Sequence, residues 1–220
     1  MTAAPWASGR RILVTGVSGF VGSRIAARCA ADGAIVAGLS RSRGRFAEAI
    51  ARGAAHLAVD LEDRDACTHA VRGFGPDVVF HFASRPDGPE SVEHARASIA
   101  ANITATVNLV EAAAPTARAI VYGDSCKVFG AHAPPYRERT PVEPNSAYGA
   151  TKAAGWWVCR ALAAASGIAA VSIRPTLIYG PHQGMNVIEF IATRALAGAP
   201  EIGLDGGDQT RDPLYIDDAV

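Results

Sequence analysis

The chain has 220 residues, and its 21 basic and 21 acidic side chains leave a formal net charge of zero. This length allows one well-buried domain, and the balanced charge excludes the basic footprint of proteins that bind nucleic acids or anionic membranes. The cysteines form no C-x-x-C pair and no cluster with the histidines, which argues against zinc and against a disulfide framework. We therefore expect small-molecule ligands, no nucleic acid and no metal.

Other features of the sequence indicate where in the cell the protein lies. Residues 1–11 lack the apolar segment of a signal peptide, and no apolar run approaches the roughly 18 residues that a membrane span needs. Unpaired cysteines fit a reducing cytosol. The sequence thus predicts a soluble, cytoplasmic protein that does not associate with membranes.

Short β-branched runs alternate with longer alanine-rich amphipathic stretches along the chain. The predicted strands are 11–15, 34–39, 55–59, 77–82, 118–123 and 169–173. The predicted helices are 20–32, 45–52, 63–72, 91–114 and 147–166. This alternation predicts an α/β fold, a doubly wound parallel sheet of the Rossmann type, whose ligands bind outside the carboxyl ends of the strands. A proline-rich segment, 126–146, predicts a long surface loop beside that crevice.

A glycine-rich loop, "TGVSGFVG", joins the first predicted strand to the first predicted helix. Glycine allows a tight turn and close backbone approach, and the helix N-terminus offers amide groups to a pyrophosphate. The spacing G-x-x-G-x-x-G differs from the G-x-G-x-x-G of many dehydrogenases, but its place between strand and helix indicates dinucleotide binding. The predicted loop residues are Gly16, Gly19, Phe20, Val21 and Gly22.

The residues after the second predicted strand bear on the choice between NAD and NADP. Ser40 stands where an acidic residue would hold the ribose 2′-hydroxyl of NAD, and Arg41 follows in a basic stretch, "LSRSRGR". An arginine here would bind a 2′-phosphate, so the pattern favours NADP, with NAD as the alternative; a solvated basic loop explains the same residues. After the third strand, Asp60 and Leu61 are candidates for the adenine, and Asp60 fits a helix cap equally well.

Tyr148 and Lys152 in "SAYGATK" lie four residues apart on a predicted helix, and therefore on one face of it. A nearby cation lowers a tyrosine pKa. The phenol would then act as general acid or base toward a substrate hydroxyl while a hydride moves at the same carbon.

Six segments in order carry a resemblance to a known family: "VTGVSGFVG", "HFAS", "NITATVNLVEAA", "YGATK", "RPTLIYGP" and "GGDQTRDPLYIDDAV". Over almost its whole length the chain resembles the extended short-chain dehydrogenase/reductases. Within them it is most similar to the NAD(P)-dependent epimerase/dehydratase group, which works mainly on nucleotide sugars. The resemblance implies an enzyme with a nucleotide-sugar substrate.

The resemblance also implies roles for single residues. Tyr148 is similar to the family's catalytic acid/base, and Lys152 to the lysine that holds the nicotinamide ribose. Ser125 is similar to the residue that hydrogen-bonds the reacting sugar oxygen. The fourth-strand motif implies cofactor contacts for Phe82, Ala83 and Ser84.

For four further residues, a structural role is an alternative to the role in binding that the resemblance implies. Asn186 and Arg211 resemble residues that bind the nucleotide diphosphate, but a helix cap and a loop arginine are alternatives. His81 and Arg174, at strand ends, fit structural roles equally well.

Two residues depart from the pattern of the related 4,6-dehydratases. In those enzymes Asp-Glu or Asp-Lys follows the catalytic serine or threonine, whereas Cys126 and Lys127 follow Ser125 here. Both remain candidates for the substrate side of the site. A thiol is a poor substitute for a carboxylic acid in aiding water loss. The sequence thus favours an epimerase or a 4-ketoreductase over a dehydratase or a non-catalytic dinucleotide sensor or scaffold.

The domain prediction follows from the same resemblance. Residues 1–173 form the NAD(P)-binding Rossmann domain with the catalytic helix, and 174–220 begin a small substrate-binding subdomain, expected to be incomplete because family members continue beyond it. Relatives commonly dimerise through two helices of each subunit. This implies a homodimer through 91–114 and 147–166, with Trp156 and Trp157 on the second helix.

Overall fold

The computed structural model describes residues 6–184, 186–204, 206 and 210–220. The chain divides into two compact units, Met1–Arg174 and Pro175–Val220. Gly207, Asp208 and Gln209 of the C-terminal motif lie outside the described residues.

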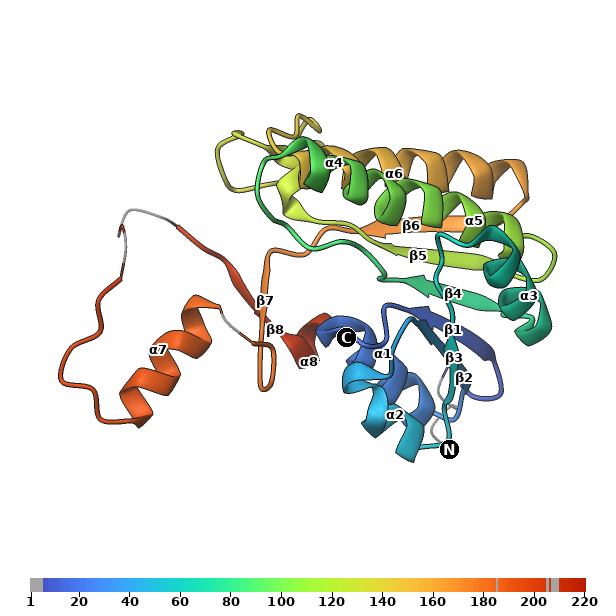
Figure 1. Ribbon diagram of the computed structural model, residues 1–220, viewed down its shortest axis with the longest axis horizontal. Helices are drawn as coiled ribbons and strands as arrows, with labels where there is room; N and C mark the ends of the chain where they lie inside the picture. Colours follow the sequence, from blue (N-terminus) through green and yellow to red (C-terminus); the bar gives the residue numbers. More distant parts are fainter. Residues whose placement is uncertain (1–5, 185, 205, 207–209) are drawn as a thin grey trace. The chain divides into compact units, whose positions relative to one another are not determined.

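The first unit is built on a six-stranded sheet with the order β3–β2–β1–β4–β5–β6 (Figure 1). Its strands are β1 (Arg11–Thr15), β2 (Ile35–Ser40), β3 (Ala55–Ala58), β4 (Val78–His81), β5 (Ala119–Gly123) and β6 (Ala169–Ile173). Every neighbouring pair is parallel. The strand order reverses between β1 and β4, the switch point where doubly wound folds bind their ligands. The predicted fold class is confirmed.

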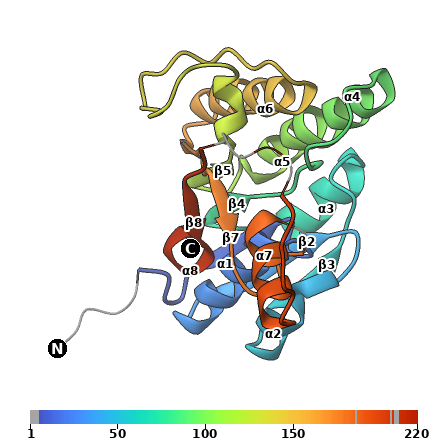
Figure 2. The ribbon, with the colours of Figure 1, turned by 90° about the vertical axis from the view of Figure 1, so that its left-hand side faces the viewer.

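Helices cover both faces of this sheet (Figures 1 and 2). On one face lie α1 (Phe20–Ala31) and α2 (Ala47–Ala51), the latter led by the short turn η1 (Gly44–Phe46). On the other lie α3 (Arg64–Phe74), α4 (Val92–Ile99), α5 (Ala105–Ala113) and α6 (Ala147–Ala165). No helix among the described residues is long and apolar enough to cross a membrane.

The core on the α3, α5 and α6 side explains why these segments fold as they do. Side chains alternate along a strand, so Leu13, Val79 and Ile120 all point to this face, where they are fully buried. Cys159 and Ala163, one helical turn apart on α6, pack into the same cluster. Both faces of the sheet are apolar, as expected for buried parallel strands.

The predicted helix 91–114 is interrupted by a π-helical turn, η2 (Ala100–Thr104), between α4 and α5. Asn102 lies in this turn and is buried. Opposite it, a Cβ on Gly155 of α6 would collide with the Asn102 carbonyl oxygen and the Tyr122 hydroxyl. Only glycine admits this close approach of α6 to η2.

The proline-rich segment 126–146 differs from its prediction at its start. Cys126–Phe129 form a 3-10 turn, η3, and Val128 and Phe129 are buried against Ala153 of α6. The prediction of a surface loop is wrong for these residues, because two apolar side chains there have a helix to pack against. The turn fixes Ser125, which precedes it.

The second unit, Pro175–Val220, contains elements absent from the predicted list. Strands β7 (Leu177–Tyr179) and β8 (Pro213–Tyr215) pair in parallel, and Tyr179 and Tyr215 pack with ring centroids 5.5 Å apart. Its helices are α7 (Val187–Leu196) and α8 (Ile216–Ala219). The strands have three residues each, too few for a periodicity signal.

Candidate active site

The glycine loop between β1 and α1 lies against the end of β4. Gly16 has a φ of +72°, and a Cβ there would stand 2.7 Å from backbone atoms of Phe82 and Ala83. Gly19 caps α1 without a side-chain hydrogen bond. The first amide groups of α1, including those of Phe20 and Val21, therefore face no capping side chain, and this cradle fits a pyrophosphate.

His81 ties the ends of β1 and β4 together. Its Nδ1 lies 2.8 Å from Thr15 Oγ1, which also accepts a hydrogen bond from the Ala83 amide at 3.0 Å. Its Nε2 lies 2.9 Å from Thr106 Oγ1, whose own proton goes to the Asn102 carbonyl. These partners assign the ring proton to Nε2 and give His81 a structural role.

The burial of His81 makes stability depend on pH. Burial, and secondarily the Lys152 charge, lower its pKa from 6.5 to about 3. Between these values the unfolded chain binds one proton more than the folded one, so stability falls as pH falls. We expect up to about 1.4 kcal/mol per pH unit from this group between pH 6.5 and 3. Urea unfolding at several pH values measures it.

A matched pair of variants isolates the contribution of His81. His81→Gln should flatten the acid limb of the stability curve, whereas His69→Gln, at an exposed position on α3, should keep the wild-type slope. Equal slopes in all three proteins would show that another group dominates the acid response.

At the end of β2, Ser40 is already engaged with its own loop. Its hydroxyl donates to the Ser42 carbonyl at 2.6 Å and lies 3.0 Å from His56 Nε2. Arg41 is exposed beside it. The structure therefore presents a serine and a basic side chain at this corner, with no carboxylate at position 40.

The residues after β3 serve local structure. Asp60 Oδ1 accepts a hydrogen bond from the Glu62 amide at 3.1 Å, and the cap of α3 is Asp63, which accepts from the Ala66 amide at 3.0 Å. The helix-cap interpretation of Asp60 is thus wrong, because the cap of α3 lies three residues later, at Asp63. Leu61 is buried in the main core.

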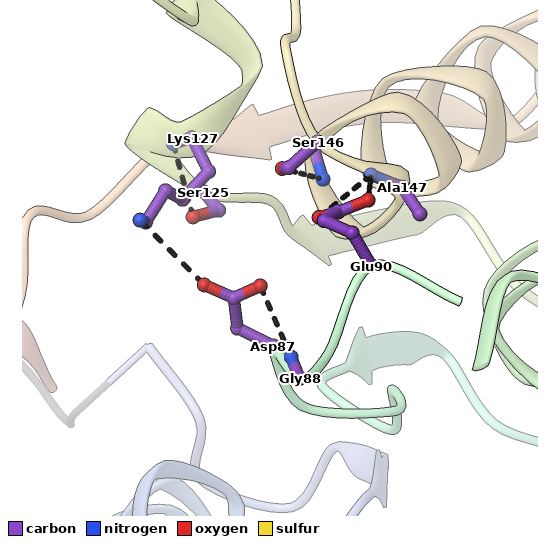
Figure 3. A network of polar contacts seen from close by, with 8 residues as sticks. Asp87, Gly88, Glu90, Ser125, Lys127, Ser146 and Ala147 are labelled. Carbon is purple, nitrogen blue, oxygen red and sulfur yellow. Dashed lines mark hydrogen bonds and ion pairs between the residues drawn. The ribbon is translucent and has the colours of Figure 1, made fainter.

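Ser125 follows the carboxyl end of β5 (Figure 3), and Tyr148 lies in the first turn of α6. The Ser125 hydroxyl oxygen accepts the Lys127 amide at 3.2 Å, which leaves its proton free to donate. Helix α6 begins after Ser146, whose hydroxyl accepts the Gly149 amide at 3.1 Å. A side-chain hydrogen bond joins Ser125 to the Tyr148 phenol.

The pKa of Tyr148 differs from the sequence prediction. Burial raises it above its ordinary value; the hydrogen bond with Ser125 lowers it, while the charges of Asp87 and Asp124 raise it further. The lowering by Lys152 that the sequence predicts is not found: burial is the largest influence on this pKa, and the spacing of two residues on a helix says nothing about burial. In the protein without ligands the phenol carries its proton at neutral pH.

Lys152 lies one turn further along α6 and is buried, with 2% of its surface exposed. Its ammonium stands 4.5 Å from the centroid of the Tyr122 ring, whose hydroxyl donates to the Lys152 carbonyl at 3.2 Å. Burial lowers the Lys152 pKa to about 8, and the Asp124 carboxylate opposes this. The amine is therefore still charged at neutral pH.

Asp124 is a site residue that the sequence analysis missed. Its buried carboxylate accepts hydrogen bonds through Oδ2 from Ser172 at 3.0 Å and from Arg174 Nε at 2.9 Å. This pairing gives Arg174 a structural role. The position of Asp124, directly after a predicted strand, is the signal that could have found it.

Two further acidic residues come from the loop 82–91 between β4 and α4, and Ser84 is exposed in the same loop. Asp87 forms an ion pair with Lys127 across 3.5 Å, and Glu90 accepts the backbone amide of Ala147 (Figure 3). They also follow a predicted strand, so the same positional rule applies to them. Cys126 is half-buried between Ser125 and Lys127.

The predicted phosphate-binding residues Asn186 and Arg211 belong to the second unit. Asn186 caps α7, since its Oδ1 accepts the amides of Ile188 at 2.8 Å and Glu189 at 3.0 Å. Arg211 is exposed and donates to the Thr210 carbonyl at 3.0 Å. The Asn186 amide nitrogen donates to Gln183, so both ends of this side chain have partners, whereas the Arg211 side chain is exposed.

Within the described ranges, no three histidine, cysteine or acidic side chains are grouped as metal ligands would be. The four cysteines are thiols and form no disulfide. Burial raises the pKa of three of them, Cys29, Cys67 and Cys159, to about 11. These three are core residues without chemical reactivity.

Comparisons with known proteins agree with this geometry. The sequence matches the NAD dependent epimerase/dehydratase family over residues 12–220. It is 31% identical to a UDP-glucose 4-epimerase of Mycolicibacterium smegmatis, over 96% of this chain and 71% of that protein. It is 29% identical to a dTDP-glucose 4,6-dehydratase of Xanthomonas campestris, over 94% of this chain and 64% of that protein.

The structural comparison gives the same result. A UDP-glucose 4-epimerase of Thermus thermophilus, solved in complex with NAD, is similar with a TM-score of 0.82 and 29% identity, over 95% of this chain and 71% of that one. Family match, sequence relatives and structure thus agree. The chain belongs to the NAD dependent epimerase/dehydratase family of extended short-chain dehydrogenase/reductases.

Proposed function

We propose that the protein catalyses reversible hydride transfer at C4 of the hexose of a nucleotide sugar, with Tyr148 as acid/base. The observation that carries this is the hydrogen bond between Ser125 and Tyr148 one turn from the buried Lys152 ammonium. This group lies in the same unit as a glycine cradle suited to a dinucleotide. The sequence relatives that act on nucleotide sugars support the choice of substrate class.

The nicotinamide cofactor would take up and return the hydride. The proposed cradle for its phosphates is Gly16 to Gly22, with Phe82, Ala83 and Ser84 along its nicotinamide half and Asp60 and Leu61 near its adenine. Ser125 would orient the C4 hydroxyl, and Tyr148 would exchange a proton with its oxygen. The Lys152 ammonium would hold the nicotinamide ribose and favour the loss of the phenol proton during oxidation.

Epimerisation or ketone reduction at C4 fits the residues better than dehydration. Dehydration needs an acid for the leaving hydroxyl and a base for a carbon-bound proton. Position 126 carries a thiol, and the Lys127 ammonium is paired with Asp87 at 3.5 Å. An ammonium in an ion pair has no lone pair with which to take a proton. The protonated Tyr148 specifically favours a 4-ketoreductase as the second candidate, because ketone reduction consumes a proton.

For the cofactor, we propose NADP over NAD, on the serine at position 40 and the exposed Arg41 beside it. Changing Ser40→Asp together with Arg41→Ala should shift the ratio of kcat/KM values toward NAD by about tenfold, since it removes a charged donor to the 2′-phosphate. Steady-state kinetics with both cofactors measures the ratio. Arg52→Ala, at the end of α2, removes an arginine outside this corner, as Arg41→Ala does within it, and should leave the ratio unchanged. An unaltered ratio in the double variant would count against NADP.

We also propose that 174–220 contributes to substrate binding. The exposed guanidinium of Arg211 suits the nucleotide diphosphate, as does the amide nitrogen of Asn186, which would exchange Gln183 for a phosphate oxygen. In this proposal the Rossmann domain, 1–173, holds the cofactor and the catalytic residues, and 174–220 supplies further contacts to the substrate.

The test of the function is incubation of the purified protein with UDP-, dTDP-, GDP- and CDP-hexoses and with their 4-keto derivatives, each with NADP(H) or NAD(H). Proton NMR of the products distinguishes inversion at C4, ketone reduction and loss of water. Inversion or reduction supports the proposal, and loss of water would assign a dehydratase instead. Because the four cysteines form no disulfide, we propose a cytoplasmic location and include a reductant.

A homodimer is proposed on the outer surface of α4 and α6, which lie side by side (Figures 1 and 2). Val92, Ile99 and Trp157 are exposed there by 73%, 49% and 51%, whereas Trp156 is buried in the core. Sedimentation equilibrium should give the mass of two chains, and Trp157→Glu should give one. Val171→Glu, at an exposed apolar position on β6, should remain dimeric. A monomeric wild-type protein would exclude this interface.

A further inference from the structure

The start of α6 is held from outside the helix. The Ser146 hydroxyl accepts the Gly149 amide, but the first helical amide, that of Ala147, has another partner. The Glu90 carboxylate accepts it with both oxygens, at 3.0 Å and 3.3 Å, from 57 residues earlier in the chain (Figure 3). A helix N-terminus carries partial positive charge, so a carboxylate is the preferred acceptor at this place.

The residue after Ala147 is Tyr148. A second set of hydrogen bonds connects the loop 82–91 to the same helical turn. The Arg85 amide donates to Asn102 Oδ1 at 2.9 Å, and Asn102 Nδ2 donates to Thr151 Oγ1 at 3.0 Å. The Thr151 hydroxyl in turn donates to the Tyr148 carbonyl at 3.0 Å. The loop 82–91 therefore fixes the first turn of α6 at two points, through Glu90 and through the buried Asn102.

The same loop reaches the other half of the site. Asp87 pairs with Lys127, whose backbone amide is bound by the Ser125 hydroxyl. Figure 3 shows the Asp87 carboxylate, the Lys127 amine and the Ser125 hydroxyl facing one another, with the Glu90 contact beside them. Both side chains of the Asp87–Lys127 pair are about half exposed, so this pair is the weaker tie. The Glu90 contact is exposed as well, but its two oxygens share the Ala147 N–H at a helix terminus, whose partial positive charge strengthens it.

We propose that Glu90 is a positioning residue: it holds the first turn of α6 so that the Tyr148 phenol stays against Ser125. The contact that carries this role is with the backbone amide of Ala147, the residue before Tyr148. Its contribution is to the placement of the reacting oxygen, where errors of an ångström reduce the rate. The kinetic consequence rests on the proposed function, whereas the contact itself does not.

Three variants separate the components of this contact. Glu90→Ala removes acceptor and charge, and Glu90→Gln keeps an acceptor oxygen without the charge. Glu93→Gln, exposed in the first turn of α4, makes the same charge change three residues away. We expect Glu90→Ala to lower kcat about tenfold with little change in KM. Glu90→Gln should recover most of this loss, and Glu93→Gln should behave as wild type.

Hydrogen exchange gives a readout that does not depend on turnover. In Glu90→Ala the amides of Ala147 and Tyr148 should exchange about tenfold faster, while amides in the middle of α6 keep their protection. Unchanged exchange at Ala147 overturns the proposal whatever the kinetics show. A loss of kcat with equal loss of protection along all of α6 also overturns it, because the role would then be purely structural.

The two hypotheses can fail separately. If the wild-type protein turns over no nucleotide sugar but Ala147 exchanges faster in Glu90→Ala, the proposed function fails and the positioning contact stands. If turnover is normal in Glu90→Ala, the positioning role fails and the proposed function stands.

Discussion

Replacing Tyr148 by phenylalanine is expected to lower kcat by about a thousandfold while cofactor affinity changes less than about twofold. The phenol is the proposed proton donor and acceptor at the C4 oxygen, and phenylalanine keeps its ring but has no ionisable group. Burial already raises the Tyr148 pKa, so the wild-type phenol is protonated and ready to donate. Ser125 would still bind the sugar oxygen, so KM should change little. Steady-state kinetics and a cofactor titration measure both quantities.

A matched control removes a hydroxyl elsewhere. Tyr136 packs on Phe129 with ring centroids 4.8 Å apart and lies in the segment after η3. Tyr136→Phe should retain wild-type kcat. Full activity in Tyr148→Phe would exclude this residue as the acid/base, and a parallel loss of cofactor binding would indicate a structural defect instead.

Adding one methyl group at Gly22 should weaken cofactor binding by more than about tenfold and destabilise the fold by about 1–3 kcal/mol. A Cβ at this position would stand 2.8 Å from the Gly16 carbonyl carbon and closer still to its oxygen. These are backbone atoms of the phosphate cradle, so the loop itself must move. Calorimetric titration with NADP and NAD, together with urea unfolding, measures the two effects in Gly22→Ala.

The control for Gly22→Ala is another helical glycine. Gly73 on α3 has nothing within 4 Å of a Cβ, so Gly73→Ala should raise the free energy of unfolding by up to about 1 kcal/mol and leave cofactor affinity unchanged. Wild-type affinity in Gly22→Ala would mean that the glycine loop does not carry the dinucleotide.

The sheet could be predicted from the sequence because hydrophobic periodicity determines each strand and its neighbours follow from the βα alternation. All six predicted strands are present, displaced by no more than one residue at either end. The π-turn at Asn102 could not be predicted, because it depends on the close approach of Gly155 from a helix far along the chain. The burial of Val128 and Phe129 likewise depends on α6, which packs on them from beyond the proline-rich segment.

The site residues that belong to a sequence motif could be predicted. Properties of the site that depend on tertiary contacts could not. Spacing places Tyr148 and Lys152 on one face of α6, but the direction of the Tyr148 pKa depends on burial and on Asp87 and Asp124, which no spacing reveals. Glu90 meets the amide of Ala147 only because the loop after β4 passes the start of α6. A contact between residues so far apart in the chain cannot be predicted from motif spacing.

The most direct measurement of the central proposal is the nicotinamide absorbance after the protein, loaded with oxidised cofactor, is mixed with nucleotide hexoses in a stopped-flow instrument. Wild-type protein should form reduced nicotinamide with at least one UDP-, dTDP-, GDP- or CDP-hexose, and Tyr148→Phe should form it about a thousandfold more slowly. No reduced nicotinamide from any of these sugars, with cofactor demonstrably bound, would contradict hydride transfer at C4.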